Sequence, residues 1–283
     1  MSDRPDYHEF YATFDPSVMT GAFDGDLDTA INACVECCDR HVGMNKVALQ
    51  WANAQGERST HTFEQLQARS AQVANLLVSQ GVGPGDVVSG LLPRIPELVS
   101  LILGVVRAGA VYQPLFTAFG NQAIDQRLTT SQAKVVVTDI ANRPKLDGLA
   151  NTPTILCIEA QSPYDADVDF VAAADEMSEL FDPVMRTGSD PLLMMSTSGT
   201  TGLPKGVRVP MRALAGFGAY MTYGLDVQPD DVFWNIADPG WAYGLYYAVL
   251  GPLLLGHQTT LYDGPFTVES TVGLVQELGI NNF

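Results

Sequence analysis

The sequence predicts an α/β protein whose parallel-rich sheets are flanked by helices. From residue 31 onward, segments with strand-like and helix-like patterns alternate along the chain, and this order is typical of parallel sheets. The strand-like segments are almost continuously apolar, as expected when helices cover a sheet on both faces. With 283 residues, the chain is long enough to form one large domain or two small ones.

The first half of the chain gives the clearest signals for individual elements. Residues 1–28 are polar, acidic and aromatic, and we expect them to form an arm on the surface. Thr62 is predicted to start a helix, since Gln65 stands where a capping box needs its partner, and Gly81 is predicted to end it. Strands are expected at 46–51, 58–61, 86–92, 110–115, 134–139 and 154–158, and helices at 31–40, 62–81, 96–108 and 121–131.

The segment 161–190 is rich in acidic residues, and we interpret it as a solvated connector that contains one helix. A boundary between two sub-lobes is predicted near residues 160–190, inside one domain that covers residues 29–283. Strands are then expected at 207–210, 231–236 and 258–262, and helices at 213–223, 243–255 and 268–278.

Charge and apolar patterning exclude several classes of protein. The chain carries 32 acidic and 15 basic residues, a formal net charge of −17, which disfavours binding to nucleic acid or to an anionic membrane. The two most apolar stretches, 98–106 and 244–256, are both shorter than the roughly 20 residues that a bilayer-spanning helix needs. We therefore expect a soluble, cytoplasmic protein with no nucleic-acid partner and no membrane span.

Three cysteines and a histidine stand close together at Cys34, Cys37, Cys38 and His41. On a helix these positions share one face, so a metal site is one interpretation. A second pair of ligands is missing from the nearby sequence, and small buried hydrophobic residues are the favoured interpretation. We expect no metal site and, in a reducing compartment, no disulfide.

A glycine- and threonine-rich segment at residues 197–206 points most directly to a chemistry. It holds four hydroxyl side chains, three glycines and one lysine, so backbone amides and a mobile cation can surround a polyphosphate. A flexible linker is the alternative, but a linker needs neither the fixed φ of Pro204 nor the charge of Lys205. The residues predicted to bind phosphate are Thr197, Ser198, Gly199, Thr200, Thr201, Gly202, Lys205 and Gly206.

This segment resembles the phosphate loop of the adenylate-forming enzymes, which include acyl-CoA synthetases, luciferases and peptide-synthetase adenylation domains. The stretch RAGAVYQPL at 107–115 is similar to the second core motif of that superfamily. QPLFTAFG at 113–120 and ADPGWAYG at 237–244 are most similar to the acetate and medium-chain acyl-CoA synthetase branch. The likeness covers about residues 30–283.

The resemblance implies a fold and a set of site residues. The fold would be the two-lobed, large N-terminal domain of these enzymes, incomplete at its C-terminus. The loop would hold the β- and γ-phosphates of ATP, and Trp241, with Ala242 and Tyr243, would line the acyl pocket; a packed core aromatic is the alternative for Trp241. Arg143 and Lys145 stand where relatives bind the coenzyme A phosphates, but the local pattern differs and exposed surface charge is the favoured interpretation.

The resemblance also implies an activity, in which ATP and a small carboxylate form an acyl-adenylate and pyrophosphate, and coenzyme A then captures the acyl group. Mg²⁺ and the residues for adenine and ribose would belong to motifs that this sequence does not contain, and no catalytic residue is identified within it. We therefore expect the N-terminal part of a longer acyl-CoA synthetase, inactive in isolation. The alternatives are a non-catalytic nucleotide-binding fragment and an enzyme that loads a carrier protein.

Overall fold

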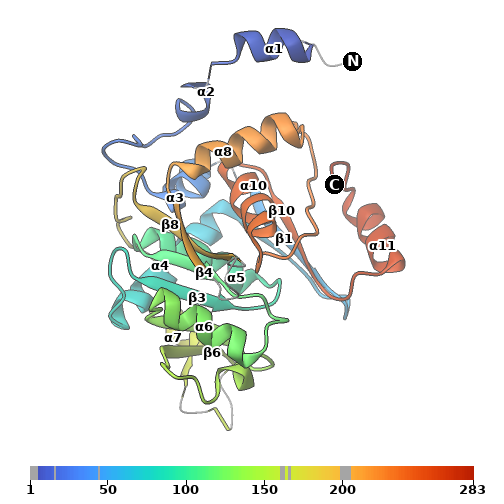
Figure 1. Cartoon of the computed structure of the whole chain (residues 1–283). Helices are drawn as coiled ribbons and strands as arrows, with labels where there is room; N and C mark the ends of the chain where they lie inside the picture. The colour runs from blue at the N-terminus through green and yellow to red at the C-terminus, as the bar shows by residue number, and fades with distance from the viewer. Residues whose placement is uncertain (1–5, 16, 44, 160–162, 165–166, 198–204) are drawn as a thin grey trace.

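The computed structural model describes residues 6–15, 17–43, 45–159, 163–164, 167–197 and 205–283. A seven-stranded sheet in the order β7-β6-β5-β3-β4-β8-β9 forms its centre (Figure 1). Neighbouring strands are parallel except for the last pair, β8 and β9. Its strands are β3 (Val87–Leu91), β4 (Val111–Pro114), β5 (Val135–Asp139), β6 (Thr154–Ile158), β7 (Val168–Asp169), β8 (Pro191–Thr197) and β9 (Lys205–Pro210).

A second sheet of three strands lies beside the first, in the order β10-β1-β2. β1 (Val47–Asn53) pairs antiparallel with β2 (Arg58–Thr62) and parallel with β10 (Thr259–Asp263), although more than 200 residues separate those two strands in the sequence. α11 (Val268–Leu278) packs on this sheet through Leu274, which shares a buried cluster with Ala52 and Tyr262. The second sheet therefore joins the beginning of the chain to its end.

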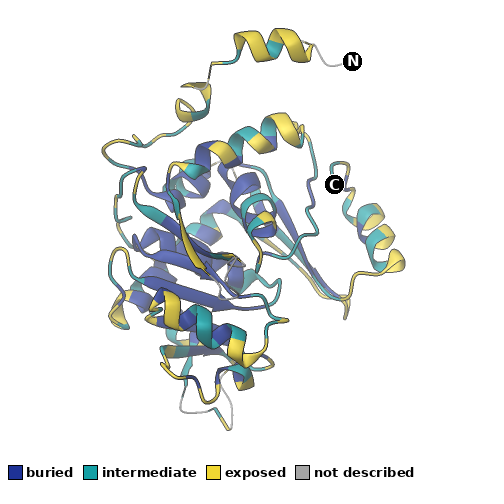
Figure 2. Ribbon diagram, in the orientation of Figure 1, coloured by how far each residue is buried: buried dark blue, intermediate teal, exposed yellow. Residues whose placement is uncertain are grey.

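Helices cover both faces of the large sheet, as Figure 2 shows by the dark blue strands between them. On one face, α4 (Phe63–Ser79) and α5 (Pro96–Arg107) share a buried cluster with Val88 and Val135. On the other face, α6 (Asn121–Ser131) packs through Ile124 and Leu128 against Leu91 and Val136. Alternate residues of one strand thus point to opposite helical layers, and the predicted α/β fold is confirmed.

Most predicted elements are present with small shifts at their ends. The helices expected at 121–131 and 268–278 and the strand expected at 154–158 have the expected bounds. Thr62 caps α4, and the reciprocal bonds of the capping box with Gln65 are both present. The connector contains α7 (Phe170–Asp175), the one helix that was expected there, and also the short strand β7.

The strand predicted at 231–236 is wrong. Within this segment the one pairing is an isolated bridge between Phe233 and Asn282. Phe233 and Trp234 are buried in two different hydrophobic clusters, so the alternation that suggests a strand reflects burial against two neighbours. Irregular backbone produces the same apolar pattern when both sides of a loop are covered.

Two predicted helices contain π-helical turns. α8 (Ala213–Ala219) continues into η3 (Tyr220–Gly224), and α9 (Ala242–Gly244) continues into η4 (Leu245–Leu250) and α10 (Gly251–Leu254). The helix expected at 31–40 also differs from the prediction, because it divides into α3 (Ala33–Cys37) and the 3-10 turn η1 (Asp39–His41). Cys38, between them, leaves helical geometry with φ −139° and ψ −64°.

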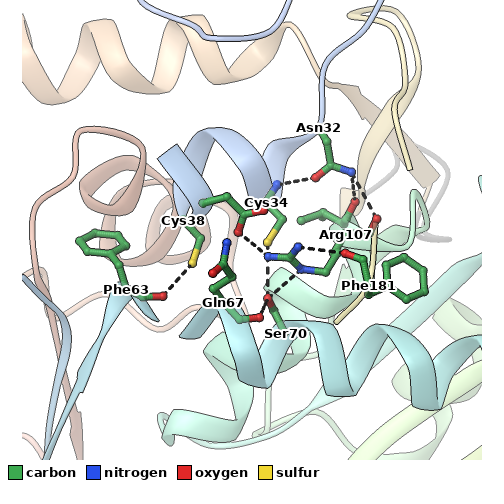
Figure 3. A network of polar contacts seen from close by, with 10 residues as sticks. Asn32, Cys34, Cys38, Phe63, Gln67, Ser70, Arg107 and Phe181 are labelled. Carbon is green, nitrogen blue, oxygen red and sulfur yellow. Dashed lines mark hydrogen bonds and ion pairs between the residues drawn. The ribbon is translucent and has the colours of Figure 1, made fainter. Parts of the chain in front are cut away.

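The cysteines of α3 belong to the core, as the favoured interpretation predicted. Cys34, Cys37 and Cys38 are free thiols with no exposed surface, and burial raises the pKa of Cys37 far above its ordinary value. In Figure 3, Cys34 lies beside a polar network centred on Arg107. The Arg107 guanidinium donates to Ser70 Oγ at 2.9 Å and pairs with Asp39.

The remaining contacts of this network tie distant segments together. Asn32 donates its side-chain amide to the carbonyl oxygens of Val106 and Val184, at 2.9 and 2.8 Å. Ser70 donates in turn to Gln67 O at 2.8 Å. The network therefore connects α3, α4, α5 and the end of the connector, and the side chains of Asn32, Ser70 and Arg107 all have partners in it, as buried polar groups require.

The N-terminal arm extends away from the sheets at the top of Figure 1. All residues of α1 (Tyr7–Thr13) are at least partly exposed. Phe10 and Phe14 contact Tyr223 of η3, with ring centroids 5.0 and 5.7 Å apart. The arm boundary at residue 28 and the sub-lobe boundary near 160–190 stay predictions.

Across the part of the chain that the structure describes, every helix is too short or too polar to cross a bilayer.

Candidate active site at the carboxyl edge of the large sheet

The predicted phosphate loop is flanked by β8 and β9, which pair antiparallel. Thr197 and Lys205 are paired across the two strands, and Gly206 pairs with Ser196. All three of Thr197, Lys205 and Gly206 are exposed. The buried stretch Leu192–Met195 anchors the hairpin in the sheet. The predicted phosphate ligands Ser198, Gly199, Thr200, Thr201 and Gly202 lie outside the described residues.

The hairpin tip shares its sheet edge with a second predicted motif. β4 and β8 are parallel neighbours, with Tyr112 opposite Leu193, so their carboxyl ends emerge on the same side. Residues 115–120 leave β4 at this edge, which is the edge where open α/β sheets bind their ligands. Phe116 and Phe119 belong to this turn, and their rings meet edge to face at 5.7 Å.

Trp241 completes an aromatic cluster with these two phenylalanines. Its ring centroid lies 5.4 Å from that of Phe116 and 5.5 Å from that of Phe119. Trp241 is 48% exposed, so the alternative that it is a packed core aromatic is wrong. The indole is held on one side and open on the other, which suits a group that contacts a small ligand.

Two glycines allow the Trp241 segment to approach its neighbours. A Cβ on Gly240 would lie 2.7 Å from Phe116 Cα, and a Cβ on Gly244 would lie 2.2 Å from Asp238 O. Both positions therefore exclude any side chain for steric reasons. Asp238 Oδ1 accepts the Gly240 N–H at 2.8 Å, and Asp238 O accepts the Trp241 N–H at 3.0 Å.

A buried tyrosine lies beneath this loop. Tyr112 is 1% exposed, and burial, together with the nearby Asp238 carboxylate, raises the pKa of its phenol far above the ordinary value. The neighbouring Gln113 accepts hydrogen bonds from Ser89 and Ser131 at 2.7 and 2.8 Å. Polar contacts under β4 thus fix the strand from which Phe116 and Phe119 extend.

Ala242 and Tyr243 begin α9, directly after Trp241. Ala242 is partly buried and packs on the main core, whereas Tyr243 is 43% exposed. The Tyr243 ring contacts Tyr247 at 5.0 Å and Tyr220 at 6.3 Å. A hydrogen bond with Tyr220, followed by burial, raises the pKa of the Tyr243 phenol.

Arg143 is buried, so the interpretation of this residue as exposed surface charge is wrong. It is 9% exposed and pairs with Asp147 at 2.8 Å and with Asp167. The hydrogen bond that its guanidinium donates to Asp167 is the largest of the causes that raise the pKa of Arg143, and this guanidinium lies 4.3 Å from the centre of the Tyr164 ring. The pairing with Asp167 could not be predicted from local sequence, because Asp167 belongs to the connector.

Lys145 is partly buried and makes local contacts. Its ammonium group donates to Asn142 Oδ1 at 2.7 Å and to the backbone oxygen of Thr117. Thr117 lies between Phe116 and Phe119, so Lys145 supports the turn that carries the aromatic cluster. Binding of coenzyme A by Arg143 and Lys145 stays a prediction.

Sequence reasoning did not single out Phe116, Phe119, Asp238, Tyr220 or Tyr247 as site residues. Phe116 and Phe119 stand inside the QPLFTAFG stretch, so that motif already contained a signal. The two tyrosines carry no local pattern that distinguishes them from core residues. Their place near Tyr243 depends on the packing of two separate helices.

A single protein-family match includes all of these motifs. Residues 38–283 match the model of the AMP-binding enzyme family, which covers most of the chain. The chain belongs to this family. The expected membership of the adenylate-forming superfamily is therefore confirmed.

Individual relatives narrow the likeness to one branch. The acetyl-coenzyme A synthetase of Bacillus subtilis is 34% identical over 97% of this chain and 49% of its own length. Acetyl-coenzyme A synthetase 2 of Candida glabrata is 35% identical over 84% of this chain and 38% of its own length. The crystal structure of an acyl-CoA synthetase from Brucella canis is 53% identical, with a TM-score of 0.94, over 98% of this chain and 51% of that one. The chain spans about half the length of these relatives.

The described residues do not form a ready-made metal site. Within the parts of the chain that the structure covers, no three His, Cys, Asp or Glu side chains converge as ligands would. A Mg²⁺ ion that accompanies a nucleotide is held by one or two carboxylates together with the phosphates, so it needs no such cluster.

Proposed function

We propose that the chain is the N-terminal part of an ATP-dependent acyl-CoA synthetase. The observation that carries the proposal is the shared sheet edge, where the β8–β9 hairpin and the Phe116–Phe119–Trp241 cluster emerge together. The ends of β8 and β9 that flank the expected phosphate loop therefore share one sheet edge with the partly exposed Trp241, which supports a site where a nucleotide and a carboxylate meet. The names of the relatives support the same reaction class.

The first half-reaction joins a carboxylate to AMP. A carboxylate oxygen attacks the α-phosphorus of ATP, and the bond to the bridging oxygen breaks as pyrophosphate leaves. Negative charge grows on the leaving group, so the Lys205 ammonium and the loop hydroxyls, Thr200 and Thr201 foremost, would lower the barrier by electrostatic stabilisation. Gly199, Gly202 and Gly206 would let the backbone follow the phosphates closely.

The second half-reaction transfers the acyl group to coenzyme A. The thiolate attacks the acyl carbon, and the bond between this carbon and the phosphate oxygen of AMP breaks. AMP leaves with the electron pair of that bond. Trp241, Ala242 and Tyr243 would line the acyl pocket through both steps. Arg143 and Lys145 would bind the coenzyme A phosphates, and this requires that phosphate replace Asp167 and Asn142 as their partners.

Two assays test the proposal. The full-length protein should form acyl-CoA from ATP, coenzyme A and a small carboxylate, and the isolated 283-residue chain should show no carboxylate-dependent pyrophosphate exchange. Exchange by the isolated chain would contradict the inactivity of the fragment. Failure of the full-length protein to form any acyl-adenylate would contradict the synthetase assignment and favour a non-catalytic nucleotide-binding role.

A carrier-protein acceptor is the remaining alternative for the second half-reaction. Acyl-adenylate formation without transfer to coenzyme A, but with transfer to a phosphopantetheinyl carrier protein, would support it. Coenzyme A is the proposed acceptor, because the relatives that the chain matches are named acetyl-coenzyme A and acyl-CoA synthetases.

A further inference from the structure

The N-terminal arm lies along the first of two helices that lead to the candidate active site. This first helix is α8 with its continuation η3, and the second is formed by α9, η4 and α10. In Figure 1 the arm lies above α8. Phe10 and Phe14 of the arm pack on Tyr223 of η3, with ring centroids 5.0 and 5.7 Å apart. The arm therefore contacts the turn at which the first helix ends.

A largely buried ion pair ties the arm to the second helix. Arg40 of η1 donates to the carbonyl oxygen of Ala22 at 2.7 Å and to that of Leu254, at the end of α10, at 2.9 Å. Glu36 pairs with Arg40 at 2.9 Å, and its carboxylate also accepts the backbone N–H of Gly25 at 2.7 Å. The arm is thus fastened to the ends of both helices.

The arm is held less tightly than the core elements. Between it and the two helices remains a hollow of about 90 Å³, whose walls include Val18, Met19, Phe23, Gly218, Thr222 and Leu254. Well-packed interiors leave few such voids, and segments with few buried contacts open locally at low cost. None of the seven residues of α1 is buried, and an isolated helix shorter than about 12 residues is marginal in water. Helix α1 therefore depends on the ring contacts of Phe10 and Phe14.

The turn that receives the arm also supports aromatic residues of the site. Tyr220 stands three residues before Tyr223 in η3. The Tyr220 ring lies 4.4 Å from that of Tyr247 and 6.3 Å from that of Tyr243, both on the second helix. π-helical turns such as η3 are rare and occur frequently at functional sites. Loss of the arm contact at Tyr223 would therefore loosen the turn against which the second helix rests.

We propose that the N-terminal arm positions the segment 241–243 by clamping η3 and the end of α10 together. The inference rests on the proposed function and adds two positioning residues, Phe10 and Phe14, which act through Tyr223. While the arm is in place, the segment is held in one arrangement before the substrate binds, so binding costs less conformational entropy. When the arm detaches, the segment samples other arrangements and substrate binding weakens.

Kinetics of the full-length enzyme test this inference. We would compare the wild type with the double variant Phe10→Ala/Phe14→Ala, using whichever of acetate, butyrate and octanoate the wild type converts fastest. The double variant should raise KM for the acid at least about threefold and keep kcat within about twofold, because the arm affects binding and contacts no reacting atom. Phe10→Tyr/Phe14→Tyr keeps both rings and should retain the wild-type KM.

Hydrogen exchange measured by mass spectrometry gives a second readout that does not depend on turnover. Loss of the two phenylalanine rings should speed the exchange of backbone amides in η3 and α9 and leave α6 unchanged. Tyr223→Ala should reproduce this effect, and combining it with the double variant should add little, because the three residues share one contact.

Tyr7→Ala/Tyr11→Ala is the matched control. It removes two rings from the same short helix, but these rings are 72% and 75% exposed. Both KM and the exchange of η3 and α9 should therefore stay at the wild-type values.

Three results would overturn the inference. The first is wild-type KM and exchange in Phe10→Ala/Phe14→Ala, and the second is an equal change in the control variant. The third is exchange that rises equally in α6, which indicates a loss of global stability instead of a local clamp. A wild type that activates none of the three acids overturns the proposed function, whereas faster exchange confined to η3 and α9 would still support the clamp.

Discussion

Gly244 lies so close to the backbone of Asp238 that a methyl group there would overlap the carbonyl oxygen at 2.2 Å. Close approach, rather than an unusual φ, is what requires glycine at this position. The same argument applies to Gly240 against Phe116. The geometry of the Trp241 loop thus depends on two residues that carry no functional group.

Gly244→Ala should therefore destabilise the protein, by about 2 kcal/mol or more, because the backbone must shift to relieve the overlap. Chemical denaturation of the purified chain measures the change. Gly273→Ala in α11 is the matched control, since a Cβ there meets no atom within 4 Å; it should stabilise the helix by about 0.5–1 kcal/mol. Equal effects of the two substitutions would contradict the steric argument.

Lys205 is exposed at the end of β9, opposite Thr197. If it binds the phosphates of ATP, Lys205→Ala should reduce kcat/KM for ATP in the full-length enzyme at least about tenfold, equivalent to about 1.4 kcal/mol. Stability should not change, because the side chain is in solvent. Lys46→Ala removes another exposed lysine, before β1, and should leave ATP use intact. Wild-type kinetics for Lys205→Ala would refute the phosphate role.

At the scale of elements, some features follow from local sequence signals, and others depend on packing between elements. The bounds of α6 and α11 and the cap of α4 followed from residues that lie within each element. The π-helical turns η3 and η4 did not follow from local residues, and aromatic rings of the two segments pack against each other there. The segment 231–236 misled the prediction, since its apolar residues are buried without strand pairing.

The capping box of α4 provides a test at this scale. Thr62 Oγ1 accepts the Gln65 N–H, and Gln65 Oε1 accepts the Thr62 N–H. Thr62→Ala removes one of the two bonds and should reduce the free energy of unfolding by about 1 kcal/mol. Thr62→Ser, which keeps the hydroxyl, should retain most of the stability in urea denaturation. Equal stability of the alanine variant and the wild type would contradict the role of the cap.

At the scale of the whole molecule, burial of histidines ties stability to pH. Burial lowers the pKa of His41, His61 and His257 from the ordinary value of 6.5. His41 lies before β1, His61 lies in β2 and His257 lies before β10. All three are therefore in or near the small sheet. Each is held neutral in the fold, whereas the unfolded chain can protonate it.

The sign of the pH effect follows from this difference. Below about 6.5 the unfolded state binds more protons than the folded state, so the free energy of unfolding should fall as pH decreases from 7 to 5. Thermal unfolding across that range measures the slope. His61→Gln should make the slope shallower, whereas His8→Gln on the exposed arm should not change it. A stability that rises on acidification through this range would contradict the prediction.

The sequence by itself determined the α/β class and the place of most elements to within a few residues, and it predicted a phosphate loop at residues 197–206. These depend on apolar periodicity, capping residues and a compact run of glycines and hydroxyls, all of which are local in the chain. Only the tertiary structure decided that Trp241 is half exposed against Phe116 and Phe119, that Arg143 is buried between Asp147 and Asp167, and that Tyr220 supports Tyr243. Each of these joins segments that are distant in sequence, and their meeting depends on how helices and strands pack rather than on any pattern within one of them.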